Sequence, residues 1–155
     1  MTPYRVYPIA SRIVSEVRHS RLSPRYGHPV FAETARGHGP CRSCLRSFDI
    51  GRECRLLFTY NAFAGLDSHP SPGPVFIHEQ PCEPFTGVSR FPEHLRMLPL
   101  TLEAYGRDRW MVARERPAAE DIEAAIDRLL GHPAVAYIHI RNTEAGCFIA
   151  RIERN

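Results

Sequence analysis

Residues 117–154 hold the pattern that most constrains the fold of this chain. In the first part of this segment, apolar side chains recur with the period of an α-helix. This apolar stripe consists of Ile122, Ala125, Ile126, Leu129 and Leu130. Pro117 suits the first turn of a helix, acidic residues follow it, and Gly131 is placed to end it. We therefore predict a helix over about residues 118–130 that packs its stripe on a sheet.

Two segments of alternating apolar and polar residues follow the helix, within residues 134–154 and around a turn that contains Gly146. Such alternation is typical of a half-buried β-hairpin. Earlier in the chain, residues 54–60 and 75–79 carry strand patterns, and residues 99–116 indicate a second hairpin. Strands with one late helix are typical of an α+β domain. We predict a single compact domain of this class with a largely antiparallel sheet.

Length and composition indicate how this domain is organised. A chain of 155 residues with 43% hydrophobic and 24% charged residues has the size and balance of one globular domain. We expect residues 39–155 to form its core, residues 1–38 to be a loosely structured leader, and the turn-rich residues 64–74 to be a loop. No apolar run approaches the ~20 residues that a membrane span needs. Polar residues also interrupt the N-terminal apolar stretch, so the expected location is the cytoplasm, without membrane contact.

Positive charge is concentrated in the first third of the chain. All twenty basic residues are arginine. Residues 1–55 carry ten of them against four acidic residues, a net charge of +6, whereas residues 56–155 carry ten against thirteen, a net charge of −3. A basic end attracts nucleic acid or an acidic partner, so an accessory protein that binds one of these is one alternative function. Because the arginines are scattered and no nucleic-acid motif surrounds them, a solvated surface is the preferred interpretation and nucleic acid is a disfavoured partner.

Five cysteines point most directly to chemistry. An odd number cannot pair completely, and a reducing location disfavours disulfides, so free thiols, a metal site or a reactive nucleophile remain. Cys41 and Cys44 form a Cys-x-x-Cys pair that follows the bend-forming Gly39-Pro40. The pair fits a metal knuckle, a redox dithiol, or a turn of small apolar residues that leads into the strand near Cys54. The residues after the pair lack the helix that a redox dithiol requires, which disfavours that interpretation.

A structural zinc site requires a second pair of ligands beside Cys41 and Cys44. His78 and Cys82, in the segment "HEQPC", supply such a pair, and Cys54 is a single alternative ligand. A non-catalytic domain that is stabilised by zinc through Cys41, Cys44, His78 and Cys82 is therefore a further alternative function.

The register of the C-terminal hairpin decides which of its side chains share a face. To keep the apolar residues together, we predict Ile140 opposite Phe148 and Ile138 opposite Ala150. This register requires a three-residue turn followed by Gly146 in the left-handed region. A four-residue turn would divide the apolar residues between the two faces of the sheet.

The predicted register also collects polar side chains on the other face. It places Arg141 opposite Cys147, with His139 diagonal to the thiol. An imidazole, a guanidinium and a thiol within reach of one another form a candidate site. Arginine binds carboxylate or phosphate and lowers the pKa of a neighbouring thiol. The competing interpretation is a solvated hairpin face in which Cys147 is a small half-buried residue.

The stretches "GPCRSCLRSF", "GPVFIHEQPCEPF" and "VAYIHIRNTEAGCFIARIER" occur in this order, the last of them after "YGRDRWMV". In these stretches the chain resembles domain-of-unknown-function family 1203, an uncharacterised bacterial group, from about residue 39 to its end. The resemblance implies a small bacterial cytoplasmic domain without an assigned activity. The residues that look like the family's own are Cys41, His139, Asn142, Gly146 and Cys147, whereas Cys44 and Cys82 lie outside this pattern.

The leading hypothesis for function is a thiol-dependent pocket that binds a small ligand or anion. Its candidate binding residues are Cys41, His139, Arg141, Asn142 and Cys147. Arg141 would anchor a small anionic ligand, His139 would transfer protons, and a cysteine would act as nucleophile or ligand. The sequence specifies no substrate, cofactor or catalytic residue.

Overall fold

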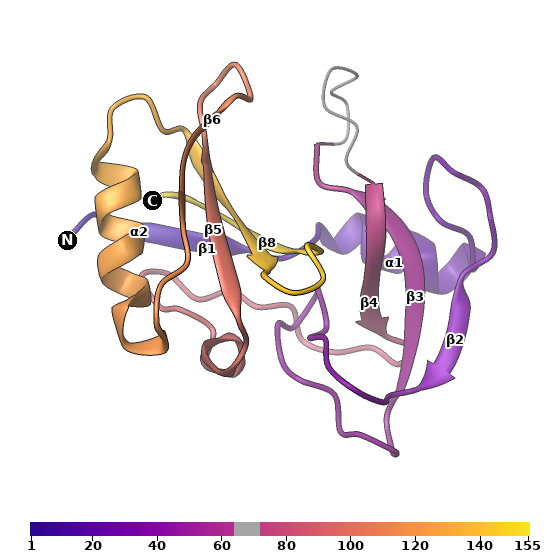
Figure 1. Ribbon diagram of the computed structural model, residues 1–155. Helices are drawn as coiled ribbons and strands as arrows, with labels where there is room; N and C mark the ends of the chain where they lie inside the picture. Colours follow the sequence, from indigo (N-terminus) through magenta and orange to yellow (C-terminus); the bar gives the residue numbers. More distant parts are fainter. Residues whose placement is uncertain (64–71) are drawn as a thin grey trace.

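The computed structural model describes residues 1–63 and 72–155, which form two antiparallel sheets, each covered by one helix (Figure 1). The strand order is β1-β8-β7-β5-β6 in the larger sheet and β2-β3-β4 in the smaller sheet. The strands of the larger sheet are β1 (Tyr4–Tyr7), β5 (Leu100–Tyr105), β6 (Met111–Glu115), β7 (Tyr137–Asn142) and β8 (Phe148–Arg154). Those of the smaller sheet are β2 (Phe31–Thr34), β3 (Cys54–Asn61) and β4 (Pro72–His78). All pairings among these described strands are antiparallel, and the predicted α+β class is confirmed.

The helix α2 (Ile122–Gly131) covers one face of the larger sheet. It continues from a short 3₁₀ turn, η2 (Ala119–Asp121), which confirms the helix predicted over residues 118–130. All five residues of the predicted apolar stripe are buried. They pack on the side chains of Leu102, Ile138, Ile140, Ala150 and Ile152. Each large aliphatic side chain buried in this core contributes about 1.5–3 kcal/mol.

The helix α1 (Ser11–Ser20) covers the smaller sheet and forms a second core with it. Val14 and Val17 are buried on the helix side of this core. Leu56 and Phe58 meet them from β3, on the side of the strand that the alternating pattern predicts to be apolar. The described residues therefore form one hydrophobic core beneath each helix and a smaller third cluster of Phe63, Tyr105 and Tyr137.

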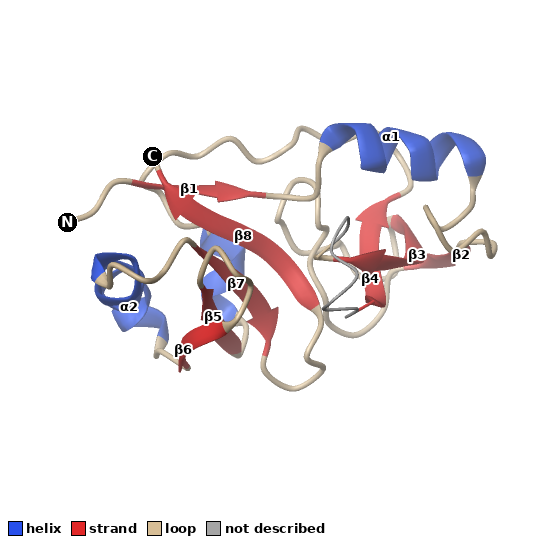
Figure 2. Ribbon diagram, turned by 90° about the horizontal axis from the view of Figure 1, so that it is seen from above, coloured by secondary structure: helices blue, strands red, loops and turns tan. Residues whose placement is uncertain are grey.

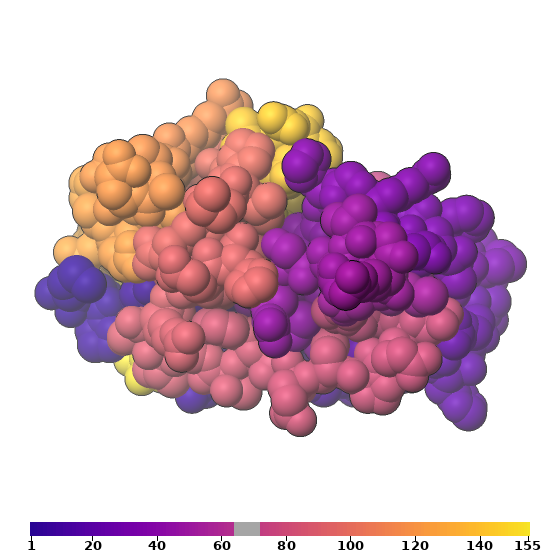
Figure 3. Space-filling model, turned by 90° about the horizontal axis from the view of Figure 1, so that it is seen from below, coloured from indigo at the N-terminus to yellow at the C-terminus, as the bar shows by residue number. Residues whose placement is uncertain are grey.

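Two connections join the halves of the molecule. The first runs from β1, at the edge of the larger sheet, directly into α1 above the smaller sheet (Figure 2). The second, residues 79–99, runs back from β4 to β5 and contains the 3₁₀ turn η1 (Glu93–Met97). It is the pink to salmon segment that extends along both halves in Figure 3. Residues 1–38, for which a loosely structured leader is expected, carry β1, α1 and β2.

The C-terminal hairpin differs from its predicted register. Ile140 lies opposite Ala150 and Ile138 opposite Ile152, a shift of two residues in β8 relative to the prediction. The turn holds four residues, 143–146, and Gly146 is left-handed with φ of 72°, as predicted. A bulge in the β7–β8 ladder then adds one residue to β8. A four-residue turn does not divide the apolar face here, because the bulge restores its alignment.

Relative to the predicted unbroken ladder, the bulge reverses the faces of the sheet on which Phe148 and Ile149 lie. Phe148 pairs with Arg141, and Ile149 joins the larger core. Cys147 lies between the turn and β8, where its thiol donates to the carbonyl of Ala145 at 3.7 Å. The predicted pairing of Arg141 with Cys147 is therefore wrong, because the prediction assumed an unbroken ladder.

All five cysteines are free thiols in this structure. Within the described ranges, no helix is long and apolar enough to cross a membrane. Most of the loop predicted over residues 64–74 lies outside the described residues, and β4 begins at Pro72.

A buried arginine joins the cysteine-containing turn to the larger sheet. The side chain of Arg42 donates from Nε to the carbonyl of Phe148 at 2.8 Å and from Nη1 to that of Pro40 at 2.7 Å. Arg42 is only 3% exposed, and burial lowers the pKa of its guanidinium to about 10. Because the bulge interrupts the ladder next to Phe148, this guanidinium satisfies a carbonyl at the interruption.

Replacement of this arginine tests how strongly the junction contributes to stability. Arg42→Ala leaves two carbonyl groups buried without a donor, so we expect the free energy of unfolding to fall by about 3 kcal/mol. Arg46→Ala removes an exposed arginine of the same turn and should change it by less than about 0.5 kcal/mol. Urea unfolding of both variants measures the difference. Equal losses in the two variants would contradict a special role for Arg42.

Candidate metal centre

Three cysteines and one histidine converge where the smaller sheet meets the turn that precedes it. The potential ligand atoms of Cys41, Cys44, His78 and Cys82 all lie within 4.8 Å of one another. The first two residues belong to the turn, His78 is the last residue of β4, and Cys82 lies four residues later. Cys82 is partly exposed and the other three are buried. The structure thus brings together the four residues of the predicted zinc alternative.

The turn that carries Cys41 and Cys44 is fixed by its own backbone. The N–H of Cys41 donates to the carbonyl of Arg46, and the N–H of Leu45 donates to that of Cys41, both at 2.9 Å. Leu45 adopts φ of 60°, which is costly for a residue with a branched side chain. Its side chain is buried in the larger core, and this burial offsets the strain. The resulting bend directs both thiols of the pair toward His78 and Cys82.

Gly39 allows the turn to approach β4 closely. Its φ is 120°, and a Cβ atom at this position would lie 3.1 Å from the ring of Phe76. The backbone N–H of Arg42 then donates to the carbonyl of Phe76 at 2.9 Å, which ties the turn to the strand that ends in His78. The Gly-Pro bend that the sequence indicates therefore serves to place the cysteine pair against β4.

Two distances within the cluster match the edges of a tetrahedral site, and all the others are within 4.8 Å. The two sulfurs of Cys41 and Cys82 lie 3.9 Å apart, and the sulfur of Cys44 lies 3.5 Å from Nδ1 of His78. Zinc bonds of about 2.3 Å to sulfur and about 2.0 Å to nitrogen give tetrahedral edges of about 3.8 Å and about 3.5 Å. A Zn²⁺ ion at the centre therefore requires little movement of these atoms.

Further groups orient the four side chains. Sγ of Cys41 accepts hydrogen bonds from the backbone N–H groups of Ser43 and His78, each at 3.4 Å. Nη2 of Arg18 donates to Sγ of Cys82 at 3.4 Å. Nε2 of His78 contacts the carboxylate of Glu53, so Nδ1 is the ring nitrogen directed at the sulfurs. A carboxylate behind the histidine and N–H donors on the sulfurs are features that support a metal ligand set.

Proximity changes the acidity of these groups. Hydrogen bonds with the Cys41 and Cys44 thiols hold the pKa of the Cys82 thiol well below its ordinary range. Hydrogen bonds with Cys41 and Cys82 raise the pKa of the Cys44 thiol. Interaction with the sulfurs of Cys41 and Cys82 also raises the pKa of His78 to about 10. Metal binding to such a cluster releases the protons that its members share.

The residues of the predicted ligand pocket have three different surroundings. Cys41 belongs to the metal cluster, and Cys147 lies between the β7–β8 turn and β8. Asn142 shapes this turn, because its Oδ1 accepts the N–H groups of Glu144 and Ala145, both at 2.9 Å. His139 and Arg141 share one face of β7, on the side away from α2.

His139 lies inside a cage of aromatic rings. It is fully buried, and its ring lies between 4.8 and 5.2 Å from four others, centroid to centroid. These rings belong to Phe63, Tyr105, Tyr137 and Phe148. Neither ring nitrogen has a hydrogen-bond partner among the described residues. Burial, together with the nearby Arg141 and Arg151, lowers the pKa of this histidine to about 3. It is therefore neutral at physiological pH.

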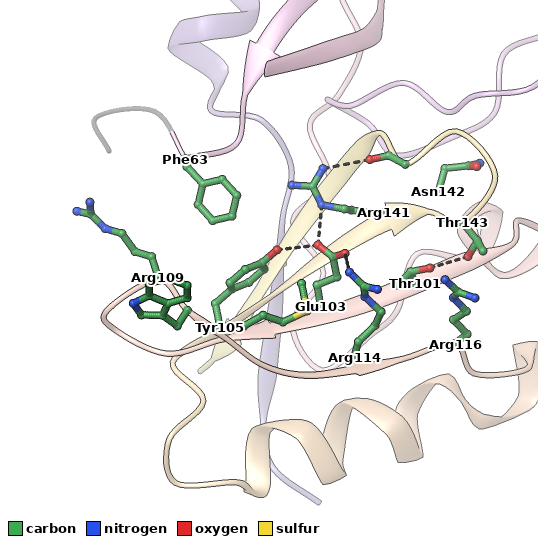
Figure 4. Close-up of a pocket in the computed structure, with 13 residues that line it drawn as sticks. Phe63, Thr101, Glu103, Tyr105, Arg109, Arg114, Arg116, Arg141, Asn142 and Thr143 are labelled. Atoms are coloured by element: carbon green, nitrogen blue, oxygen red, sulfur yellow. Dashed lines mark hydrogen bonds and ion pairs between the residues drawn. The ribbon is translucent and has the colours of Figure 1, made fainter. Parts of the chain in front are cut away.

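Arg141 lines a separate pocket of about 540 Å³, shown in Figure 4. Its Nε donates to the carboxylate of Glu103 at 2.9 Å, and its Nη1 donates to the carbonyl of Gly146 at 3.1 Å. Glu103 also accepts hydrogen bonds from Tyr105 and Arg114. The sequence analysis missed these β5 and β6 residues. A signal was present, since polar Thr101, Glu103 and Tyr105 alternate with apolar residues along β5.

Comparison with known proteins agrees with the resemblance stated above. Residues 38–154 match the family described as protein of unknown function, DUF1203. The chain belongs to the DUF1203 family. No curated protein and no solved structure matches it. All four residues of the cysteine–histidine cluster lie within the DUF1203 segment, and so do His139 and Arg141. The family description names no activity, so the chemistry of this DUF1203 chain is inferred from its geometry.

The buried histidine of this DUF1203 chain makes stability depend on pH. The pKa of His139 falls from 6.5 to about 3 on folding, so the unfolded chain binds a proton that the folded chain excludes. Stability is then lost as the pH falls below about 6.5, by about 1.4 kcal/mol per pH unit. Burial raises the pKa of the neighbouring Tyr105 and Tyr137, so both phenols stay neutral over this range.

His139→Phe removes the titrating group and retains an aromatic ring in the cage. We expect the stability of the variant relative to wild type to increase steadily as the pH is lowered from about 7 to about 4. Urea unfolding at several pH values measures this difference, and effects of all other titrating groups cancel in the comparison. A difference that does not change with pH would contradict the burial of a neutral histidine.

Proposed function

We propose that this DUF1203 chain is a zinc-binding domain in which Cys41, Cys44, His78 and Cys82 hold one structural Zn²⁺. The observation that carries the proposal is the convergence of four side-chain donors at tetrahedral spacing. They come from two segments that lie 34 or more residues apart, as the Cys44–His78 contact shows. A metal ion here would therefore crosslink the turn to the end of β4.

The donor set favours zinc over other metals. Three sulfurs and one imidazole nitrogen suit Zn²⁺, whereas Mg²⁺ and Ca²⁺ prefer oxygen ligands. Four protein ligands fill a tetrahedral site and leave no position for substrate, which is typical of a structural zinc site. A pocket of about 390 Å³ borders Cys44, His78 and Cys82 and provides a route for the ion.

The charges around the cluster also support bound zinc. Zn²⁺ with three thiolates and a neutral histidine has a net charge of −1. Arg42 is buried near Cys41, and in the part of the chain that the structure describes it has no carboxylate partner. Arg18 donates directly to Cys82. An anionic metal complex would be favoured by the Arg18 guanidinium that donates to it and by the nearby positive charge of Arg42.

Metal content tests the proposal directly. Protein purified without added metal should contain about one equivalent of zinc per chain, measured by mass spectrometry of the elements. Cys44→Ser and Cys82→Ser should each lower the content to below about a tenth of an equivalent after dialysis against a weak chelator. Cys54→Ser is the matched control, because Cys54 is exposed and lies outside the cluster, and it should retain the metal.

Cobalt provides a second readout that is independent of purification. Co²⁺ added to metal-depleted wild-type protein should give the thiolate-to-cobalt charge-transfer bands and strong visible bands of a tetrahedral site. The proposal is overturned if wild type binds neither metal, or if both cluster variants keep the wild-type spectrum.

Chelation should reveal the contribution of the metal to stability. Removing a tightly bound zinc ion lowers the free energy of unfolding by about 3–4 kcal/mol. We therefore expect EDTA to lower Tm by about 10 °C. Cys82→Ser should have a low Tm that EDTA does not change. An equal decrease of Tm in wild type and variant would instead indicate an effect of the chelator elsewhere on the protein.

A further inference from the structure

We propose that the pocket beside β6 binds a small anion that carries an aromatic ring, the chemistry of a mononucleotide. This pocket lies between β5, β6 and the β7–β8 turn, and it is separate from the zinc ligands (Figure 4). Its volume of about 540 Å³ is within the range of small-molecule sites, which is about 300–1,000 Å³.

The charge of the pocket lining is strongly positive. Its ionisable side chains are Arg109, Arg114, Arg116, Arg141 and Glu103, a net charge of +3. Glu103 is 8% exposed and already accepts hydrogen bonds from Tyr105, Arg114 and Arg141. Its carboxylate therefore orders the pocket and leaves most of the positive charge uncompensated. Such a site attracts an anion with more than one negative charge.

One end of the pocket presents donors for a phosphate group. Arg141 is held by Glu103 and Gly146, and its Nη2 has no partner among the described residues. Arg116 makes no ion pair within that same part of the chain. Figure 4 shows the Arg116 guanidinium near the hydroxyls of Thr101 and Thr143, which lie 2.7 Å apart, and the Arg141 guanidinium beside Glu103. A pre-oriented arginine costs less entropy when it binds an oxyanion.

The opposite end of the pocket presents flat surfaces. Tyr105 and Phe63 meet edge to face at 5.2 Å, and Trp110, which is 67% exposed, also lines the pocket. Arg109 lines the pocket too and holds an unfavourable φ of 72°. Aromatic rings and a guanidinium plane are the groups on which a planar base stacks. The two ends together match a phosphate joined to a ring.

The size of this lining favours a small molecule over a polymer. The four arginines gather around one cavity, whereas a nucleic-acid strand requires a basic track with successive stacking positions. If the experiment below instead detects preferential binding of single-stranded nucleic acid, that outcome contradicts the proposal.

Trp110 supplies the signal for the experiment, because it is the only tryptophan of the chain. Adenosine 5′-monophosphate is titrated into the zinc-loaded full-length protein while tryptophan fluorescence is recorded. We expect saturable quenching by the nucleotide and binding at least about tenfold weaker for adenosine alone and for inorganic phosphate alone. Equal affinity for phosphate and nucleotide, or tighter binding of an oligothymidylate than of the mononucleotide, would overturn the proposal.

Two variants distinguish specific binding in this pocket from nonspecific attraction of the nucleotide by positive charge. Arg116→Gln should weaken nucleotide binding by about tenfold or more, because it removes a charged donor from the phosphate end. Arg107→Gln removes the same charge from an exposed position in the neighbouring β5–β6 turn, outside this pocket, and should leave the affinity within about twofold of wild type. Equal weakening in both variants, or none in either, sinks the proposal. Zinc content is measured in each sample, so failure here is distinguishable from failure of the proposed metal site.

Discussion

The hydrogen bonding of β8 is the constraint on which the rest of this structure depends. This strand begins in one core, where Phe148 packs beneath α1, and continues in the other, where Ala150 and Ile152 pack beneath α2. A regular strand places alternate residues on opposite faces, but it cannot change which set of residues faces a given core. The bulge at Ile149 makes that change within one residue. The two halves can therefore share a strand and keep both of their apolar surfaces covered.

The proposed zinc ligands lie in and beside a turn that contacts both cores. Leu45 is anchored in the larger core, whereas Cys41 and Cys44 belong to the smaller one, so a single turn contacts both. Arg42 adds a hydrogen bond to the strand at its bulge. A metal ion would fix the short turn whose position determines how the halves meet. We regard this mechanical role as a sufficient reason for a buried cysteine–histidine cluster in a domain with modest cores.

Patterns carried by neighbouring residues were sufficient to predict several elements of the fold, but not β1, α1 and β2 in residues 1–38. The stripe of α2 and the alternation along β3 are local periodicities, and the structure contains both. Spacing also indicated the four members of the cysteine–histidine cluster as one alternative, because a Cys-x-x-Cys pair needs a partner pair and the sequence offered His78 with Cys82. The bulge at Ile149 could not be predicted in this way, since the donor to the carbonyl beside it is Arg42, which is distant in sequence. Glu103 was missed for a related reason: the pairing of β5 with β7 is set by tertiary packing.

The arginines in and beside β6 lie at an open edge of the larger sheet, and their charge affects how that edge can associate. β6 is an outer strand of the larger sheet, and its Met111 and Val112 are both partly exposed. An exposed apolar strand with free hydrogen-bonding groups is a template for edge-to-edge aggregation. An antiparallel association of two copies centred on Glu115 would bring Arg114 of each copy against Arg116 of the other, and like charges repel there. The positive charge that we propose attracts an anion would thus also disfavour this self-association.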